Sequence, residues 1–313
     1  MGVPFPREAP RPAPSAEFPF ESRFVEIEAP RARGASLRAR IHYVETGRGR
    51  PILFVHGNPT AAYLWRNVLP FAARHGRAIA LDLLGHGLSD KPDVDYAFEE
   101  HAAVLAAFVE RLRLADLVLV LHDWGGPLGF RLALGRPGLV RAVAAMETFP
   151  WRLSWETLPQ LGRLAFRAFR TPGLGPFLLQ RLDLFTRLVL PLAVADRRTF
   201  SQQARARYRS FSPTSASRKA LRRWPEQLPL DAETETWQAI GELEHALASW
   251  DRPLLWLAAR PGAVTTPERL AWLQRTVPQV EIRDLGRGGH FLQEEIPDAI
   301  GAALDAWLPR VVG

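Results

Sequence analysis

LVLVLHDWGGPLGF, the stretch from Leu117 to Phe130, decides the fold of this chain. A run of branched apolar residues ends at His122 and Asp123, and a tryptophan, two glycines and a helix-like segment follow. A nearly continuous apolar run, without alternation, is typical of a strand that is covered on both faces. The stretch therefore predicts a strand, a tight turn and a helix, with the carboxylate of Asp123 at the turn. Such a carboxylate is either a helix N-cap or a functional group.

Similar apolar runs occur on both sides of this unit, and helix-like stretches separate them. Strands and helices in alternation predict a mostly parallel sheet with helices on both faces. In such a sheet, polar groups at the carboxyl ends of the strands share one edge, where ligands bind. The expected strands are 51–57, 77–87, 116–123, 141–147, 252–260 and 279–286, and the expected helices are 61–73, 97–112, 125–134 and 296–308.

The alternation stops between residues 150 and 229. This segment is rich in Leu, Phe, Arg and Trp at helical spacing and has few strand signals, so we expect a helical cap domain over one edge of the sheet. A cap in that place would exclude water from a site beneath it. The core domain is then predicted to comprise 17–149 and 230–313. Residues 1–16 contain five prolines and are expected to form a flexible arm.

Composition restricts the possible functions. The 313 residues are 47% hydrophobic and include no cysteine, which excludes a disulfide framework and a thiolate zinc site. Residues 1–20 have no continuous apolar segment, and no apolar run approaches the roughly 18 residues of a membrane span. We therefore expect a cytoplasmic protein without a membrane partner. The net charge is +7, but the arginine clusters match no nucleic-acid-binding motif, so no nucleic-acid partner is expected.

A carboxylate at the turn suits a particular chemistry. Asp123 is already ionised at pH 7 and can displace a good leaving group from a saturated carbon, which gives an ester. Water must then cleave that ester, and a base is needed. Of the eight histidines, only His290 follows Asp123 in a glycine-rich turn after a late strand. Glu147 ends another predicted strand and can orient the histidine, whereas no acid follows the strand 252–260 before Glu268, which looks helical.

Two hydrogen-bond donors complete this predicted site. Trp124 directly follows Asp123, and Asn58 follows the strand 51–57. An indole N–H only donates, and an asparagine amide offers two more donors. Trp124 alone would most often be a packing residue, but two neutral donors beside a nucleophile predict a site for a departing anion.

At this point the sequence resembles a known family, the haloalkane dehalogenases of the α/β-hydrolase fold. The resemblance rests on four motifs that occur in order, and it runs from about Phe18 to the C-terminus, more weakly over 151–223. It implies a mostly parallel eight-stranded sheet, covered by helices on both faces, with a helical cap insertion. The motifs are HGNPT at 56–60, HDWG at 122–125, METFP at 146–150 and GHFLQE at 289–294.

The resemblance also implies the reaction and the role of each residue. Asp123 is the nucleophile, His290 the base and Glu147 its acid partner, while Asn58 and Trp124 hold the halide and their backbone N–H groups bind the oxyanion. The partners are then a small halogenated organic substrate, a halide ion and water, without metal or organic cofactor, and the chain is expected to be a monomer. The positions that resemble pocket residues of the family are Phe166, Pro225 and Leu228.

Two departures from the family pattern bear on substrate fit: the METFP segment is shorter before its proline, and Gly126 stands where some members carry serine. Three other functions remain open. An epoxide hydrolase uses the same nucleophile with cap tyrosines as acids, and Tyr208 is the one tyrosine of 150–229. A coelenterazine-oxidising luciferase shares the triad pattern. A non-catalytic binder on this fold is expected to have lost a triad residue, and none is lost here.

Overall fold

The computed structural model describes residues 14–31 and 35–313, so most of the predicted arm 1–16 lies outside the described residues. One sheet has the strand order β1-β2-β4-β3-β5-β6-β7-β8. β2 is antiparallel to both of its neighbours, and the other strand pairs are parallel. This confirms the predicted eight-stranded, mostly parallel sheet. The strands are β1 Arg23–Ala29, β2 Leu37–Thr46, β3 Pro51–Val55, β4 Arg77–Leu81, β5 Leu117–Asp123, β6 Val140–Thr148, β7 Leu254–Pro261 and β8 Glu281–Gly288.

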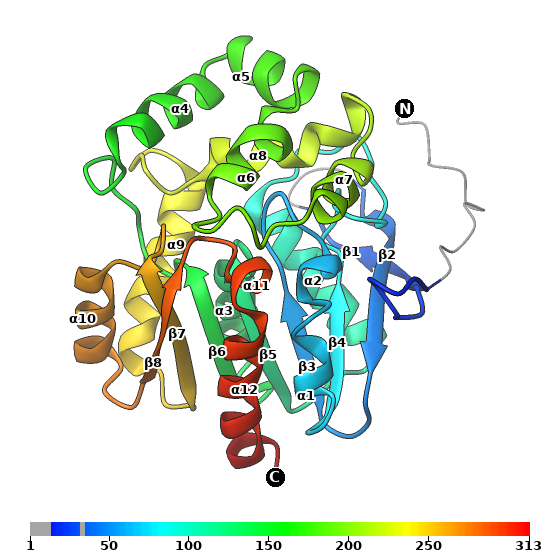
Figure 1. Ribbon diagram of the computed structural model, residues 1–313, viewed down its shortest axis with the longest axis vertical. Coiled ribbons are helices and arrows are strands. Elements are labelled where there is room, and N and C mark those ends of the chain that lie inside the picture. The colour runs from blue at the N-terminus through cyan, green and yellow to red at the C-terminus, as the bar shows by residue number, and fades with distance from the viewer. Residues whose placement is uncertain (1–13, 32–34) are drawn as a thin grey trace.

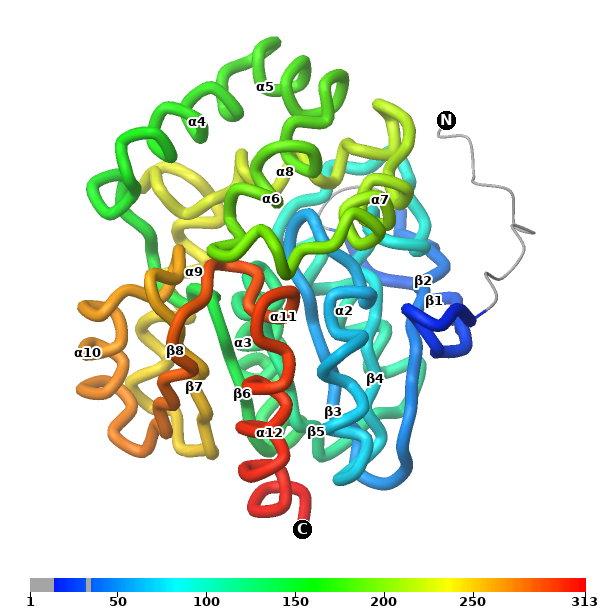
Figure 2. Tube along the Cα trace, in the orientation of Figure 1, coloured from blue at the N-terminus to red at the C-terminus, as the bar shows by residue number. Residues whose placement is uncertain are grey.

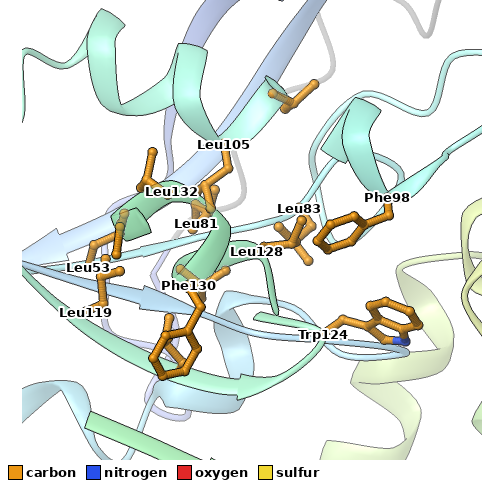
Figure 3. Close-up of a cluster of buried hydrophobic side chains, with 14 of the residues drawn as sticks. Leu53, Leu81, Leu83, Phe98, Leu105, Leu119, Trp124, Leu128, Phe130 and Leu132 are labelled. Atoms are coloured by element: carbon orange, nitrogen blue, oxygen red, sulfur yellow. The ribbon is translucent and has the colours of Figure 1, made fainter. Parts of the chain in front are cut away.

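Helices cover the sheet on both faces, and the side chains of β5 show the division. Leu119 and Leu121 face one core cluster, and Val118 and Val120 face the other. The first cluster (part of which is drawn in Figure 3) packs under α2, α3 and α9, and the second under α1 and α12, of which α12 lies in front of the sheet in Figure 1. These helices are α1 Leu69–Ala72, α2 Phe98–Arg111, α3 Gly125–Gly135, α9 Glu235–Ala246 and α12 Pro297–Val312.

The expected helix 61–73 is wrong in its continuity. The structure has a short 3-10 helix η1, Ala62–Trp65, and then the four-residue α1. Pro70 lies at the start of α1 and has no N–H to donate to the preceding turn, so a helix that continued through this position would lose a backbone hydrogen bond. The N–H of Ala62 is instead taken by Asp82 Oδ1 at 2.6 Å, which fixes the start of η1 against the end of β4.

Between β6 and α9 the chain forms helices only, and Figures 1 and 2 show them above one end of the sheet. The limits of a separate cap domain, 150–229, stay a prediction. Within the described residues, no helix is both long enough and apolar enough to cross a membrane. The helices in question are α4 Gln160–Arg170, α5 Leu174–Pro176, the π-helical η2 Phe177–Arg181 and η3 Phe185–Val189, α6 Leu190–Leu192, α7 Gln202–Ser210, the 3-10 helix η4 Ala216–Arg218 and α8 Lys219–Gln227.

A buried polar cluster joins this helical layer to the rest of the molecule. Tyr208 of α7 donates its hydroxyl hydrogen to Glu294 Oε1 at 2.6 Å, and Arg66 makes two hydrogen bonds to the same carboxylate at 2.6 and 2.7 Å. All three side chains are buried. Glu294 belongs to α11, Leu292–Glu295, which follows the loop that carries His290. The cluster therefore fixes α7 and that loop relative to each other.

Candidate active site

Asp123 is the last residue of β5, and its backbone has a φ of 51°. This left-handed conformation is costly for a residue with a side chain and persists where the surroundings impose it. Two glycines make room for the turn: a Cβ on Gly125 would lie 2.1 Å from the carbonyl oxygen of Val55, and a Cβ on Gly57 would lie 2.0 Å from Asp123 Oδ1. The strand end and its glycines therefore present the carboxylate of Asp123 at the tip of a tight turn.

Backbone N–H groups hold this carboxylate. Asn58 donates its backbone N–H to Asp123 Oδ1 at 2.7 Å, and the backbone N–H of Trp124 also binds the carboxylate. Burial by itself would raise the pKa of Asp123, but the hydrogen bond and positive charge of His290 outweigh it and lower this pKa below its ordinary value. Asp123 is thus held as an anion, and the backbone N–H of Asn58 orients its Oδ1.

Thr148 supports the turn from behind. Its hydroxyl donates to the carbonyl oxygen of Asp123 at 2.5 Å, and a Cβ on Gly126 would lie 1.7 Å from that hydroxyl oxygen. The space of a side chain at 126 is therefore already occupied by Thr148. The departure at Gly126 has a local packing reason in this chain.

Glu147 lies near the end of β6 in a second left-handed conformation, with a φ of 44°, and it is fully buried. Its carboxylate accepts backbone N–H groups of the loop after β7: Ala263 at 2.7 Å, Val264 at 3.0 Å and Thr265 at 3.4 Å. These donors stabilise a buried negative charge that would otherwise be costly. The loop after β7 thus supplies hydrogen bonds for the acid of β6 instead of an acid of its own.

His290 lies between the two carboxylates. Its Nε2 is 3.3 Å from Asp123 Oδ2, and its Nδ1 is 3.3 Å from Glu147 Oε2. Burial by itself would lower the pKa of His290, but the hydrogen bonds and negative charges of Asp123 and Glu147 outweigh it and raise the pKa to about 9. In the resting site the ring is therefore an imidazolium at pH 7.

His122 supports the loop of His290. Its Nε2 lies 2.8 Å from the carbonyl oxygen of His290, and the two rings are 4.8 Å apart between centroids. Burial, above all, lowers the pKa of His122 to about 3, so the ring is neutral and donates Nε2–H to that carbonyl. The loop after β8 is thereby held under the end of β5.

The amide of Asn58 is fixed in orientation by two contacts. Its Nδ2 donates to the carbonyl oxygen of Leu221 in α8 at 3.2 Å, and its Oδ1 lies 3.3 Å from His86 Nε2. The first contact uses one of two N–H bonds on Nδ2, so the second is available for a ligand. Helix α8, one of the helices between β6 and α9, therefore positions this donor.

Trp124 is buried in an aromatic enclosure (Figure 3 shows its indole beside Phe98). Its ring centroid lies 4.4 Å from that of Trp224 in α8, 5.0 Å from that of Phe149 and 6.3 Å from that of Phe98. In an apolar surrounding, a hydrogen bond from the indole N–H to an anion is stronger than in water.

The three predicted pocket residues lie among the helices between β6 and α9. Phe166 of α4 is half-buried and packs on Phe169, with ring centroids 6.0 Å apart. Pro225 lies inside α8, and Leu228 follows this helix. The contact to the site comes instead from Trp224, the neighbour of Pro225. A role of Phe166, Pro225 and Leu228 in a substrate pocket stays a prediction.

Sequence reasoning missed four supporting residues: His86, His122, Thr148 and Trp224. His122 and Thr148 each adjoin a predicted site residue, so their positions in the sequence could have indicated that they support the site. His86 lies within the expected strand 77–87, just beyond the end of β4 at Leu81, but nothing in the sequence shows that it meets Asn58. Trp224 lies far from any strand end in sequence and reaches the site only through the folded chain. Within the described residues, no cluster of three or more His, Asp or Glu side chains is arranged to hold a metal ion.

Comparisons with known proteins agree on one family. The family model described as alpha/beta hydrolase fold matches residues 50–297. A haloalkane dehalogenase of Mesorhizobium japonicum is 40% identical over 88% of this chain and 90% of its own length. A haloalkane dehalogenase of Sphingobium indicum is 39% identical over 94% of this chain and 97% of its own length.

Solved structures give the same result. The crystal structure of haloalkane dehalogenase DbeA from Bradyrhizobium elkani superposes with a TM-score of 0.86 at 36% identity, over 93% of this chain and 99% of the other. That of haloalkane dehalogenase DatA from Agrobacterium tumefaciens has a TM-score of 0.84 at 35% identity, over 92% of this chain and 97% of the other.

Proposed function

Because this chain belongs to the haloalkane dehalogenase family, with the α/β-hydrolase fold, we propose that it hydrolyses the carbon–halogen bond of small halogenated organic molecules. The products are an alcohol, a halide ion and a proton. The observation that carries the proposal is the position of His290, whose two ring nitrogens each lie 3.3 Å from a carboxylate, Asp123 on one side and Glu147 on the other.

In the first step, a carboxylate oxygen of Asp123 forms a bond to the carbon that bears the halogen, and the carbon–halogen bond breaks with its electron pair on the halide. The side-chain N–H groups of Trp124 and Asn58 stabilise the developing halide charge. Each such donor in a water-excluded site contributes about 3 kcal/mol. The halide leaves as a weak base, so this step needs no proton donor from the cap.

In the second step, water cleaves the ester. Esterification neutralises Asp123, one of the two anions that raise the pKa of His290, so the imidazolium loses its proton to solvent and becomes a base. Neutral His290, oriented by Glu147, takes a proton from water as the water oxygen attacks the ester carbonyl carbon. The backbone N–H groups of Asn58 and Trp124 hold the resulting oxyanion. The collapse of this intermediate releases the alcohol and restores Asp123.

The epoxide hydrolase alternative needs an acid in the cap, and Tyr208 was the candidate. In the structure its hydroxyl is engaged with Glu294, and burial, above all, raises the pKa of Tyr208 well above its ordinary value. It is therefore occupied as a structural donor. The presence of all three triad residues in contact argues against a non-catalytic binder.

The remaining expectations are carried as part of the proposal. We propose that residues 150–229 form a cap domain on the core 17–149 and 230–313, and that the substrate binds beneath this cap. The contacts of α8 with Asn58 and Trp124 support this arrangement. The absence of a nucleic-acid partner and a cytoplasmic location stay predictions from composition, and the monomer stays a prediction from the resemblance.

The experiment is a release assay for halide and protons with 1,2-dibromoethane and 1-iodobutane, with styrene oxide and coelenterazine as rival substrates. The proposal expects one halide and one proton per alcohol formed from the haloalkanes. Turnover of styrene oxide without haloalkane turnover would favour an epoxide hydrolase instead, and light from coelenterazine without haloalkane turnover would favour a luciferase.

A prediction for the halide donors is that Trp124→Phe lowers kcat roughly 10²- to 10³-fold and weakens inhibition by added halide. Phenylalanine keeps the packing against Trp224 and Phe149 but removes the indole donor. Steady-state kinetics with bromide as inhibitor measures both effects. Trp272→Phe, a half-buried tryptophan of α10 (Pro267–Thr276), is the matched control. Equal losses in both variants would assign Trp124 to packing alone.

A second prediction concerns stability and pH. The pKa of His290 is about 9 in the folded chain and about 6.5 in an unfolded chain. Its contribution to stability is therefore complete below pH 6.5 and is lost as the pH rises through 9, a loss of about 3 kcal/mol. We expect the difference in unfolding free energy between wild type and His290→Gln, from urea titrations, to shrink between pH 6.5 and 10. A difference independent of pH would contradict an imidazolium in the resting site.

A further inference from the structure

The exposed apolar side chains of this protein are concentrated in one region. Among residues 14–31 and 35–313, every large hydrophobic side chain that is exposed lies between 161 and 192, in or beside α4, α5, η2, η3 and α6. Single exposed hydrophobic residues are ordinary, but seven of them within the 32 residues 161–192 indicate an interaction surface. We call this group the apolar cap surface. It consists of Leu161, Leu164, Leu174, Phe177, Leu182, Leu188 and Leu192.

These side chains do not serve the interior of the protein. On α4, Leu161 and Leu164 are three residues apart and share one face, with exposures of 77% and 58%. Phe166 and Phe169 lie on another face of the helix and pack toward a small buried cluster with Phe185. α4 and α5 form the outermost layer of the molecule, at the end opposite the C-terminus (Figure 1).

The helical segment 150–229, which contains this surface, carries the positive charge of the whole chain. Residues 150–229 contain fifteen basic and four acidic residues, a net charge of +11, whereas the net charge of the full chain is +7. The rest of the chain is therefore slightly acidic. Exposed arginines stand between the exposed apolar residues: Arg181 next to Leu182, and Arg187 next to Leu188. No ion pair of Arg181 occurs within the part of the chain that the structure describes, and Arg187 pairs only with Asp183, at 3.5 Å.

We propose that the apolar cap surface binds peripherally to an anionic lipid bilayer, with its leucines and Phe177 at the level of the headgroups and the surrounding arginines against lipid phosphates. Apolar and arginine side chains on one surface are the combination that partitions into a charged membrane interface. A second copy of the chain fits less well, because residues 161–192, which carry this surface, contain five basic residues and one acidic residue, so two such surfaces would repel each other at short range.

The proposal revises one sequence-based expectation. The lack of a long apolar run predicts that no segment crosses a membrane, and in the sequence analysis it also excludes a membrane partner. Peripheral binding requires no spanning segment, because separate residues of short helices supply the apolar contact. The proposal does not depend on the reaction at Asp123.

Flotation of the purified full-length chain with vesicles tests it. We expect binding to vesicles of phosphatidylcholine with one part in four phosphatidylglycerol, little binding to phosphatidylcholine alone, and loss of binding in about 0.5 M salt, where charges are screened within about 4 Å. These measurements need no variant. Equal binding to both kinds of vesicle, or binding to neither, would overturn the proposal.

Two variants locate the surface. Leu164→Gln with Phe177→Gln removes apolar contact, and Arg181→Glu with Arg187→Glu reverses two charges; we expect each pair to lower vesicle affinity at least about tenfold. Arg111→Glu with Arg275→Glu, two exposed arginines of α2 and α10, makes the same change of net charge outside the cap and is the matched control. An equal loss in this control would contradict a localised surface.

Sedimentation velocity of the lipid-free chain tests whether a second copy of the chain binds this surface instead. A dimer that forms with rising concentration and is dissolved by Leu164→Gln with Phe177→Gln, without vesicle binding by the wild type, would assign the surface to a second copy and overturn the proposal. Far-ultraviolet circular dichroism shows whether each variant is folded, and the changes lie at exposed positions, where substitutions cost little stability.

Discussion

Asp123→Ala is expected to abolish haloalkane turnover, with a fall in kcat of at least about 10⁴-fold, the scale of loss for removal of a catalytic nucleophile. Alanine has no oxygen with which to displace the halide. The effect should lie in kcat, measured as halide release under saturating 1,2-dibromoethane, because the halide donors and the cap layer remain in place. The buried His290 also loses one of its two anionic partners, so its pKa should fall in the variant.

The control for this change is Asp251→Ala, which removes a carboxylate that is exposed and remote from the triad. It should leave halide release within experimental error of the wild type. If Asp123→Ala retained a tenth of the wild-type rate while folded, a nucleophile other than Asp123 would have to be sought.

His290→Gln is expected to stop the reaction after its first half. Asp123 can still displace the halide, but no base activates water, so the alkyl ester accumulates. Intact-mass spectra after exposure to 1-iodobutane should show one added butyl group per chain, and halide release should end after one equivalent. Steady-state turnover should fall at least about 10³-fold, since both removal of the base and loss of its ordered position act on the second step.

Two controls bracket this result. His245→Gln, an exposed histidine of α9, should turn over normally and show no adduct. The double variant Asp123→Ala with His290→Gln should show no adduct either, because the acceptor carboxylate is gone. An adduct that persists in the double variant would place the ester on another residue.

Much of the fold could be predicted because its central strands are buried on both faces. β3, β4, β5, β6 and β7 are mostly buried and each contains or overlaps an apolar run that predicts a strand. The edge strand β8 overlaps the expected strand 279–286 but is mostly half-buried or exposed. β1 and β2 were not among these runs. In β1, buried Val25 and Ile27 alternate with exposed Glu26 and Glu28, the pattern of a strand near the edge with one covered face, and such short alternation is easily lost among charged residues.

The site was predictable to the extent that it depends on the ends of the strands. Asp123, Glu147 and His290 come from β5, β6 and the loop after β8, and a parallel sheet brings these ends to one edge. Asn58 and Trp124 adjoin the same edge. The orientation of their donors was not predictable, because it depends on α8, which supplies the carbonyl of Leu221 and the ring of Trp224.

The positions of side chains in the helices between β6 and α9 could not be predicted from the sequence. Three-residue helices and π-helical turns interrupt this layer, so helical spacing alone gives no reliable register for its residues. The placement of Phe166, Pro225 and Leu228 relative to a substrate depends on that register. Their assignment by resemblance therefore remains a prediction.

In the proposed reaction, Asp123 forms an ester and water attacks the carbonyl carbon of this ester. A single turnover of excess enzyme with 1,2-dibromoethane in water enriched in the heavy isotope of oxygen tests it directly. We expect the heavy oxygen to appear in the side chain of Asp123, located by peptide mass spectrometry, and the alcohol of this first turnover to carry ordinary oxygen from the carboxylate. Heavy oxygen in the alcohol, with none in Asp123, would mean that water displaces the halide itself and would rule out an ester on Asp123.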